Sequence, residues 1–275
     1  ELDAVPGGIG LTAWLNRTYA GAGFGSGPEG VVGGAEGMQQ GFAGLFGDAE
    51  RVHIVVSEEA VAYRPEMAWL AEQLNAASGR HRFHVRDAGF GGFAPGDAVY
   101  RFFELFDLAN VPCAGPLFDL ARAGRVRVTP PPKPIFEEKL LLALLWNRNL
   151  RSFWRMELGE RFFERLLERV PYTWVLDPTP LPPHAAIPEL HISDWRQLAT
   201  LSQRERALVL KISGFSELAW GARGVFLGSD LSREDWAAAV ERALESFPQS
   251  PYVLQRYEKP RQVEIDWCDF DGPCV

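Results

Sequence analysis

Apolar runs alternate with amphipathic stretches through the first half of this 275-residue chain. The run at 51–57 (RVHIVVS) is almost continuously apolar, which is typical of a strand buried on both faces. Residues 65–77 instead place Met67, Leu70 and Leu74 three and four positions apart, the spacing of one helix face. Further strands are predicted at 81–89 and 125–132, a short helix at 118–123, and a strand or a helix at 98–108. This alternation predicts βαβ units and an open α/β sheet.

Residues 133–170 place apolar side chains at helical spacing and interleave them with arginines and glutamates. Because the acids balance the arginines, the pattern favours a helical stretch with a solvated, ion-paired face over a helix that binds nucleic acid. The apolar positions are Leu150, Phe153, Trp154, Leu158, Phe162, Leu166 and Val170.

Beyond a proline-rich linker at 178–188 the chain again alternates strands and helices. Ser232, followed closely by two acids, has the features of a helix N-terminus. The predicted helices span 193–201 and 232–247, and the predicted strands span 172–177, 207–213, 224–229, 252–257 and 262–268. We therefore expect an α/β protein whose C-terminal part is α+β. We divide it into a glycine-rich segment (1–50), an α/β domain (51–132) and a C-terminal region (133–275).

The composition of the chain argues against several classes of protein. The net charge of −8 argues against a dedicated nucleic-acid-binding protein, which would need clustered lysine and arginine. Three scattered cysteines do not form a disulfide framework, so we expect a reducing, cytoplasmic setting. The strongest apolar run, at 140–146, is far shorter than the roughly 20 residues that cross a membrane. The chain starts without Met and ends just after a turn-forming Asp271-Gly272, where a returning strand would begin, so we expect a part of a longer protein.

The stretch at 207–228 carries the most informative candidate chemistry. Lys211 lies at the end of an apolar run and is followed by Gly214, Gly221 and Gly224. Glycines let backbone N–H groups approach phosphate oxygens, and a strand-borne lysine supplies a point charge for the same oxygens. This pattern predicts a phosphate-binding strand and loop, although an edge lysine and an ordinary loop remain the alternative.

Two other motifs carry less weight. Residues 25–30 match GxGxxG, but no strand precedes them, so irregular loops around short helices are favoured over a loop that contacts phosphate or substrate. His81 and His84 lie on opposite faces of the predicted strand, which makes them poor co-ligands for a metal ion.

Four pieces in order resemble the ATP-grasp superfamily, and within it the glutathione synthetase and glutathionylspermidine synthetase-like group. The first is the preceding α/β domain, similar to a pre-ATP-grasp domain. The second is Glu138-Lys139 at the start of a helix, and the third is VLKISG (209–214) with the WGARGV loop (220–225). The fourth is the strand YVLQRY at 252–257, which resembles the hinge that receives adenine.

The resemblance implies ATP bound between two lobes and an ATP-dependent ligase that joins a small-molecule carboxylate and an amine through an acyl phosphate. It implies that Lys139 and Lys211 contact the phosphates and that Gly221, Arg223 and Gly224 form a lid over them. Gly214 would also lie in the nucleotide site, and Arg223 is the candidate catalytic residue. Gln255 and Tyr257 would lie near adenine, and Glu258 or Glu264 would accept hydrogen bonds from the ribose. A homo-oligomer is compatible with this class, and neither a nucleic acid nor a membrane is an expected partner.

The resemblance makes residues 133–275 an ATP-grasp region that we expect to be incomplete at its C-terminus, because the family carries its Mg²⁺ ligands on strands beyond the hinge. Glu264 and Asp266 are two apart on a predicted strand, so they share a face and are the candidate Mg²⁺ ligands. A solvated strand face followed by a turn at 269–272 is the competing interpretation. If the metal ligands are lacking, the chain is instead a non-catalytic nucleotide-binding or scaffold protein that keeps the fold.

Overall fold

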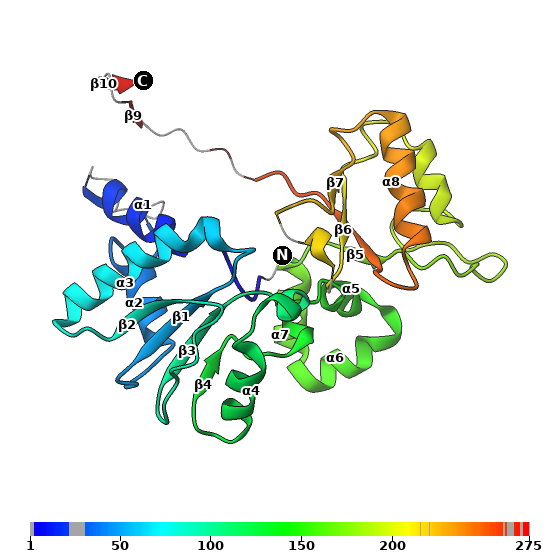
Figure 1. The fold of residues 1–275 in the computed structure, drawn as a ribbon. Coiled ribbons are helices and arrows are strands. Elements are labelled where there is room, and N and C mark those ends of the chain that lie inside the picture. Colours follow the sequence, from blue (N-terminus) through cyan, green and yellow to red (C-terminus); the bar gives the residue numbers. More distant parts are fainter. Residues whose placement is uncertain are drawn as a thin grey trace. The chain divides into compact units, whose positions relative to one another are not determined.

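A computed structural model describes residues 3–21, 31–214, 216–219, 221–260, 262, 267–269 and 272–274. The chain forms two compact units (Figure 1). The first unit runs to Lys139 and includes the short segment Gly214–Glu217. The second unit comprises Leu140–Ser213 and the chain from Leu218 onwards.

A parallel sheet forms the centre of the first unit. Its strands are β1 (Val52–Val56), β2 (Phe83–Asp87), β3 (Ala98–Phe102) and β4 (Arg127–Thr129), in the order β2-β1-β3-β4. All five residues of β1 are buried, as expected for a strand covered on both faces. The predicted open α/β sheet is therefore confirmed.

Helices cover both faces of this sheet. Adjacent residues of β3 point to opposite sides, since Tyr100 packs against Phe42 of α2 while Val99 packs with Leu117 of α4. The helices of this unit are α1 (Ile9–Gly21), α2 (Gly37–Gly44), α3 (Arg64–Ser78) and α4 (Ala114–Arg122), and α1, α2 and α3 contact one another (Figure 1).

Local sequence explains the bounds of α3. Pro65 lies in its first turn, where a missing N–H costs nothing, and Gly79 ends it in the left-handed conformation at φ +63°. The side chains predicted to face the core, Met67, Leu70 and Leu74, are all buried.

The second unit contains an antiparallel sheet. Its strands are β5 (Thr173–Val175), β6 (Leu208–Ile212), β7 (Val225–Leu227) and β8 (Tyr252–Arg256), in the order β5-β8-β6-β7. Helix α8 (Arg233–Glu245) packs on one face through a core that includes Leu210, Trp236 and Leu254. Its N-terminus is capped as predicted, because Ser232 Oγ accepts the Asp235 N–H at 3.0 Å.

The segment expected to be helical from 133 to 170 is divided into α5 (Leu140–Trp146), α6 (Arg151–Leu158) and α7 (Glu160–Arg169). Gly159, at φ +74°, separates α6 from α7 and breaks the helical register. The predicted apolar stripe is consequently not a single buried face, because Phe153 and Phe162 are 46% and 63% exposed. An ion pair between Arg155 and Glu160, at 2.9 Å, agrees with the expected charged face.

Several element bounds differ from the prediction. Residues 98–108 are divided between β3 and a 3₁₀ turn at Leu105–Asn110, and the helix expected at 118–123 starts earlier, at Ala114. Residues 195–200 form a 3₁₀ turn rather than an α-helix, started by a capping box between Asp194 and Gln197. Of the strand expected at 262–268, the structure describes β9 (Trp267–Asp269), which pairs with β10 (Gly272–Cys274), so a returning strand lies within the chain.

Candidate functional site

The sheet of the second unit has two chemically different faces. Residues directly opposite each other in an antiparallel pair point to the same side. Thr173 is paired with Gln255, and Lys211 with Val253, so these residues share the face away from α8. We call this the polar face. The alternate residues, such as Leu210 and Leu254, lie in the core under α8.

A chain of hydrogen bonds crosses the polar face. Lys211 Nζ donates to Gln255 Oε1 at 3.4 Å, and Gln255 Nε2 donates to Thr173 Oγ1 at 2.8 Å. Thr173 Oγ1 in turn donates to the carbonyl oxygen of Pro171 at 2.8 Å. Gln255 and Thr173 are buried, whereas Lys211 is half-buried. This series of hydrogen bonds therefore fixes the orientation of the Gln255 amide. It also keeps the Lys211 ammonium group at the edge of a buried surface.

Buried apolar side chains flank Lys211 on the polar face. Val209 and Val253, both buried, share the polar face with Lys211 because they lie two residues along a strand or directly opposite it. A charge beside buried apolar surface is less screened than a charge in bulk water, so its attraction for an anion is strengthened.

The loop after β6 is shaped by three glycines. Gly221 and the following Ala222 both adopt positive φ, +62° and +60°. A Cβ at Gly224 would lie 2.4 Å from Ile212 Cγ2, and a Cβ at Gly214 would lie 2.4 Å from a carboxylate oxygen of Glu138. Backbone geometry and close packing thus account for these glycines.

Contacts at the end of β6 link it to a helix. Ser213 Oγ accepts the N–H of Leu140 at 2.9 Å, which satisfies a donor at the first residue of α5. Lys139 directly precedes this helix and is the last residue of the first unit before the division.

The remaining predicted site residues are distributed along the loop and the end of β8. Arg223 is exposed in the loop. The N–H of Tyr257, two residues beyond Gln255, donates to the Ala207 carbonyl at 3.0 Å, and Glu258 after it is exposed. Glu264 and Asp266 lie outside the described residues.

Of the site residues predicted from the sequence, the structure brings Lys211 and Gln255 into contact. Sequence reasoning missed Thr173, although its polar position in an otherwise apolar strand was a signal.

A pocket of about 720 Å³ borders the polar face at β5. We call it the aromatic pocket, because Trp146, Tyr172 and Trp174 line it. The rings of Trp146 and Tyr172 are stacked at 4.4 Å between centroids, and the ring of Trp174 is tilted against Tyr172 at 4.6 Å. Burial raises the pKa of Tyr172, which Arg148 opposes, and Thr173 also lines the pocket. The sequence did not predict this pocket, because its walls come from three separate segments, α5, β5 and the proline-rich linker.

The described residues include no group of three or more His, Cys, Asp or Glu side chains placed to hold a metal ion. His81 and His84 are closer than predicted, with ring centroids 4.6 Å apart. The expectation of opposite faces was wrong because His81 lies before the start of β2, where strand alternation does not apply. None of the helices in the described part of the chain has the length and apolarity needed to cross a bilayer.

Comparison with known protein families gives no match, and comparison with functionally characterised proteins gives no significant similarity. The assignment of a function to this site rests on its residues and geometry.

Proposed function

We propose that the second unit binds ATP on the polar face and that the protein is an ATP-dependent carboxylate–amine ligase. The observation that carries the proposal is the series of hydrogen bonds from Lys211 through Gln255 to Thr173, on the sheet face opposite α8, with the half-buried Lys211 at its edge. The order of lysine strand, glycine loop and glutamine strand, similar to that of ATP-grasp proteins, supports the same conclusion.

Lys211 supplies positive charge for the phosphate oxygens. Its ammonium group carries three hydrogen-bond donors at the end of a flexible side chain. The buried side chains of Val209 and Val253 beside it strengthen the attraction of Lys211 for an anion. Gln255 positions the lysine and does not need to contact the nucleotide through its side chain.

Arg223 supplies a second cation in the loop after β6. A phosphoryl group carries its developing charge on three oxygens, so catalysis needs positive groups placed around it. In the proposed reaction a carboxylate oxygen of the acid attacks the γ-phosphorus, ADP leaves, and the amine nitrogen then displaces phosphate from the acyl carbon. Lys211 and Arg223 stabilise the phosphate charge in both steps.

Magnesium, when bound, would neutralise phosphate charge. Its predicted ligands, Glu264 and Asp266, lie outside the described residues, so no step is assigned to them.

Calorimetric titration with ATP and Mg²⁺ tests the binding site, with GTP as comparison. We expect saturable ATP binding, weakened about tenfold to a hundredfold by Lys211→Ala, since a hydrogen bond to a charged group is worth about 1.5–3 kcal/mol. Lys133→Ala, which removes an exposed lysine of the first unit, is the matched control and should bind ATP normally. Equal affinity of the K211A and wild-type proteins would remove Lys211 from the site.

Release of ADP tests the ligase step. A panel of small carboxylates and amines should produce ADP only when an acid is present, with a coupled amide product when an amine is added. Saturable ATP binding without ADP release under any combination would support the alternative, a non-catalytic nucleotide-binding protein.

A further inference from the structure

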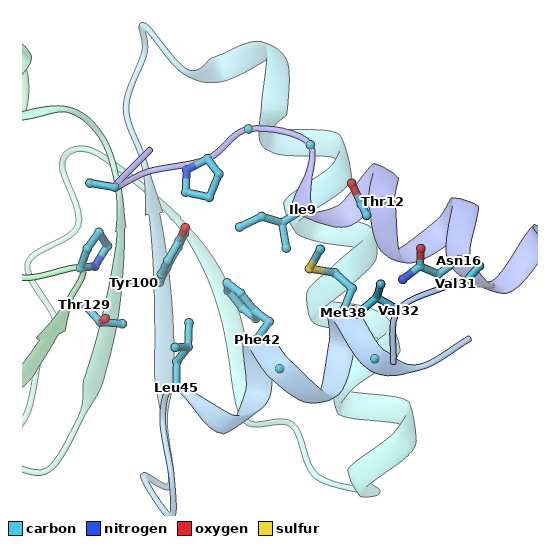
Figure 2. Close-up of a pocket in the computed structure, with 17 residues that line it drawn as sticks. Ile9, Thr12, Asn16, Val31, Val32, Met38, Phe42, Leu45, Tyr100 and Thr129 are labelled. Atoms are coloured by element: carbon cyan, nitrogen blue, oxygen red, sulfur yellow. The ribbon is translucent and has the colours of Figure 1, made fainter. Parts of the chain in front are cut away.

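A second pocket, of about 800 Å³, lies within the first unit (Figure 2). Its walls come from the N-terminal segment, α1, α2, β3 and the end of β4. Tyr100 of β3 and Thr129, the last residue of β4, are directly paired across the sheet and lie at one end. We call this the apolar pocket. Pockets for small molecules typically enclose roughly 300–1,000 Å³, so this one is large enough for a whole ligand.

Its lining is apolar and uncharged. None of the described residues that line it is an Asp, Glu, Lys, Arg or His. Ile9, Met38 and Phe42 line its middle part (Figure 2). Burial raises the pKa of Tyr100, so its phenol stays neutral across the physiological range. A nucleotide would therefore find no counter-charge here, and an uncharged ligand would meet no desolvated charge.

Hydrogen-bonding groups lie at the two ends of the pocket. Thr12 and Asn16 of α1 lie at one end, away from Tyr100 and Thr129 (Figure 2). A hydroxyl and an amide offer both donors and acceptors, and a few such groups in an apolar pocket fix the orientation of a ligand.

Apolar side chains that line the pocket are left in contact with water. Val32 is 94% exposed and Leu45 is 55% exposed, and both belong to the lining. A ligand that covers these side chains removes apolar surface from water, which favours binding of an apolar molecule.

Helix α2 leaves space for such a ligand. Gly41 belongs to the lining, and a Cβ there would meet no described atom within 4 Å. Glycine inside a helix lowers stability relative to alanine, and here its missing side chain keeps the wall of the pocket open.

We propose that the apolar pocket binds an uncharged, mostly apolar small molecule with a hydrogen-bonding group at an end. The proposal is independent of ATP binding, because every lining residue belongs to the first unit.

Two fluorescent dyes that differ by one charge test this proposal. N-phenyl-1-naphthylamine is uncharged and apolar, and its sulfonated analogue 1-anilinonaphthalene-8-sulfonate is an anion. We expect the uncharged dye to bind at a single saturable site, with an affinity at least about tenfold higher than that of the sulfonated dye. Absence of saturable binding of the uncharged dye, or equal affinity for both dyes, would overturn the proposal.

Two glycines of α2 provide a matched pair of variants. Gly41→Leu should fill the pocket and weaken binding of the uncharged dye at least about tenfold. Gly44→Leu adds the same side chain to the same helix, at a position that also has open space but does not line the pocket, and should bind normally. Equal binding by both variants would place the dye elsewhere.

A third variant keeps the test decisive if G41L fails to fold, as judged by circular dichroism. Leu45→Glu introduces a charge at an exposed lining position and should also weaken binding of the uncharged dye. Unchanged affinity in this variant would contradict the proposed location.

Discussion

Two neighbouring carboxyl groups, those of the half-buried Glu104 and of Glu137, should make the free energy of unfolding fall as pH rises. Arg101, which is fully buried, pairs with Glu137 at 2.7 Å, and the N–H of Leu105 donates to the other oxygen of Glu137 at 2.9 Å. These two contacts fix the position of the Glu137 side chain. Burial, together with the nearby Glu137 charge, raises the pKa of Glu104 to about 8, so Glu104 keeps its proton at neutral pH.

The size of this change in the free energy of unfolding follows from the pKa of Glu104 in the folded and in the unfolded chain. Glu104 has a pKa of about 8 in the fold against 4.5 for the free side chain. The folded state therefore binds the Glu104 proton more tightly than the unfolded state does. The resulting contribution to the free energy of unfolding is complete below pH 4.5 and is lost as pH rises toward 8. At about 1.4 kcal/mol per pKa unit, and with partial exposure reducing the effect, Glu104 costs on the order of 2–3 kcal/mol at neutral pH.

The substitution Glu104→Gln removes this cost. The amide stays neutral at every pH and can still donate a hydrogen bond to Glu137, as the protonated acid does. We expect E104Q and the wild-type protein to have similar free energies of unfolding near pH 4.5, and E104Q to become progressively more stable as pH rises toward 8.

Denaturant unfolding across this pH range measures the difference. Glu58→Gln, at an exposed position of the same unit, is the control and should show no such divergence. A constant difference between E104Q and wild type, or an E104Q protein that is less stable near pH 8, would refute the raised pKa of Glu104.

Two further predictions concern stability. His53 lies 3.1 Å from Asp97 and accepts from Arg86, and burial lowers its pKa, so the free energy of unfolding should fall as pH drops below 6.5. His53→Gln should flatten that slope in acid denaturation, and an unchanged slope would exclude His53. Gly224→Ala should cost more than about 1 kcal/mol in denaturant unfolding, because its Cβ would clash with Ile212, whereas Gly115→Ala in α4 should be neutral or stabilising.

Local sequence was sufficient where one pattern determines the structure. The apolar run of β1, the spaced leucines of α3 and the capped start of α8 were all predicted close to their observed bounds. The break at Gly159 was missed because the apolar spacing continues across it, although the backbone there leaves the helical conformation. The 3₁₀ turn at 195–200 has the same capping signal as an α-helix, so sequence alone does not separate the two.

The candidate site was predicted only in part. Lys211 and Gln255 are 44 residues apart in the chain, and alternation within each strand did not specify that the strands would pair with both side chains on one face. Neither pocket was predicted, because each is built from segments that are distant in the sequence. Several residues of the glycine-rich N-terminal segment line the apolar pocket, but their spacing in the sequence does not indicate a cavity.

The most direct test of the central claim is the calorimetric titration of ATP into the wild-type and Lys211→Ala proteins, in the presence of Mg²⁺. We predict one saturable ATP site in the wild-type protein and an affinity reduced about tenfold or more in the folded K211A variant. Absence of saturable binding to the wild-type protein, or identical affinities for the two proteins, would contradict the assignment of the polar face as a nucleotide site.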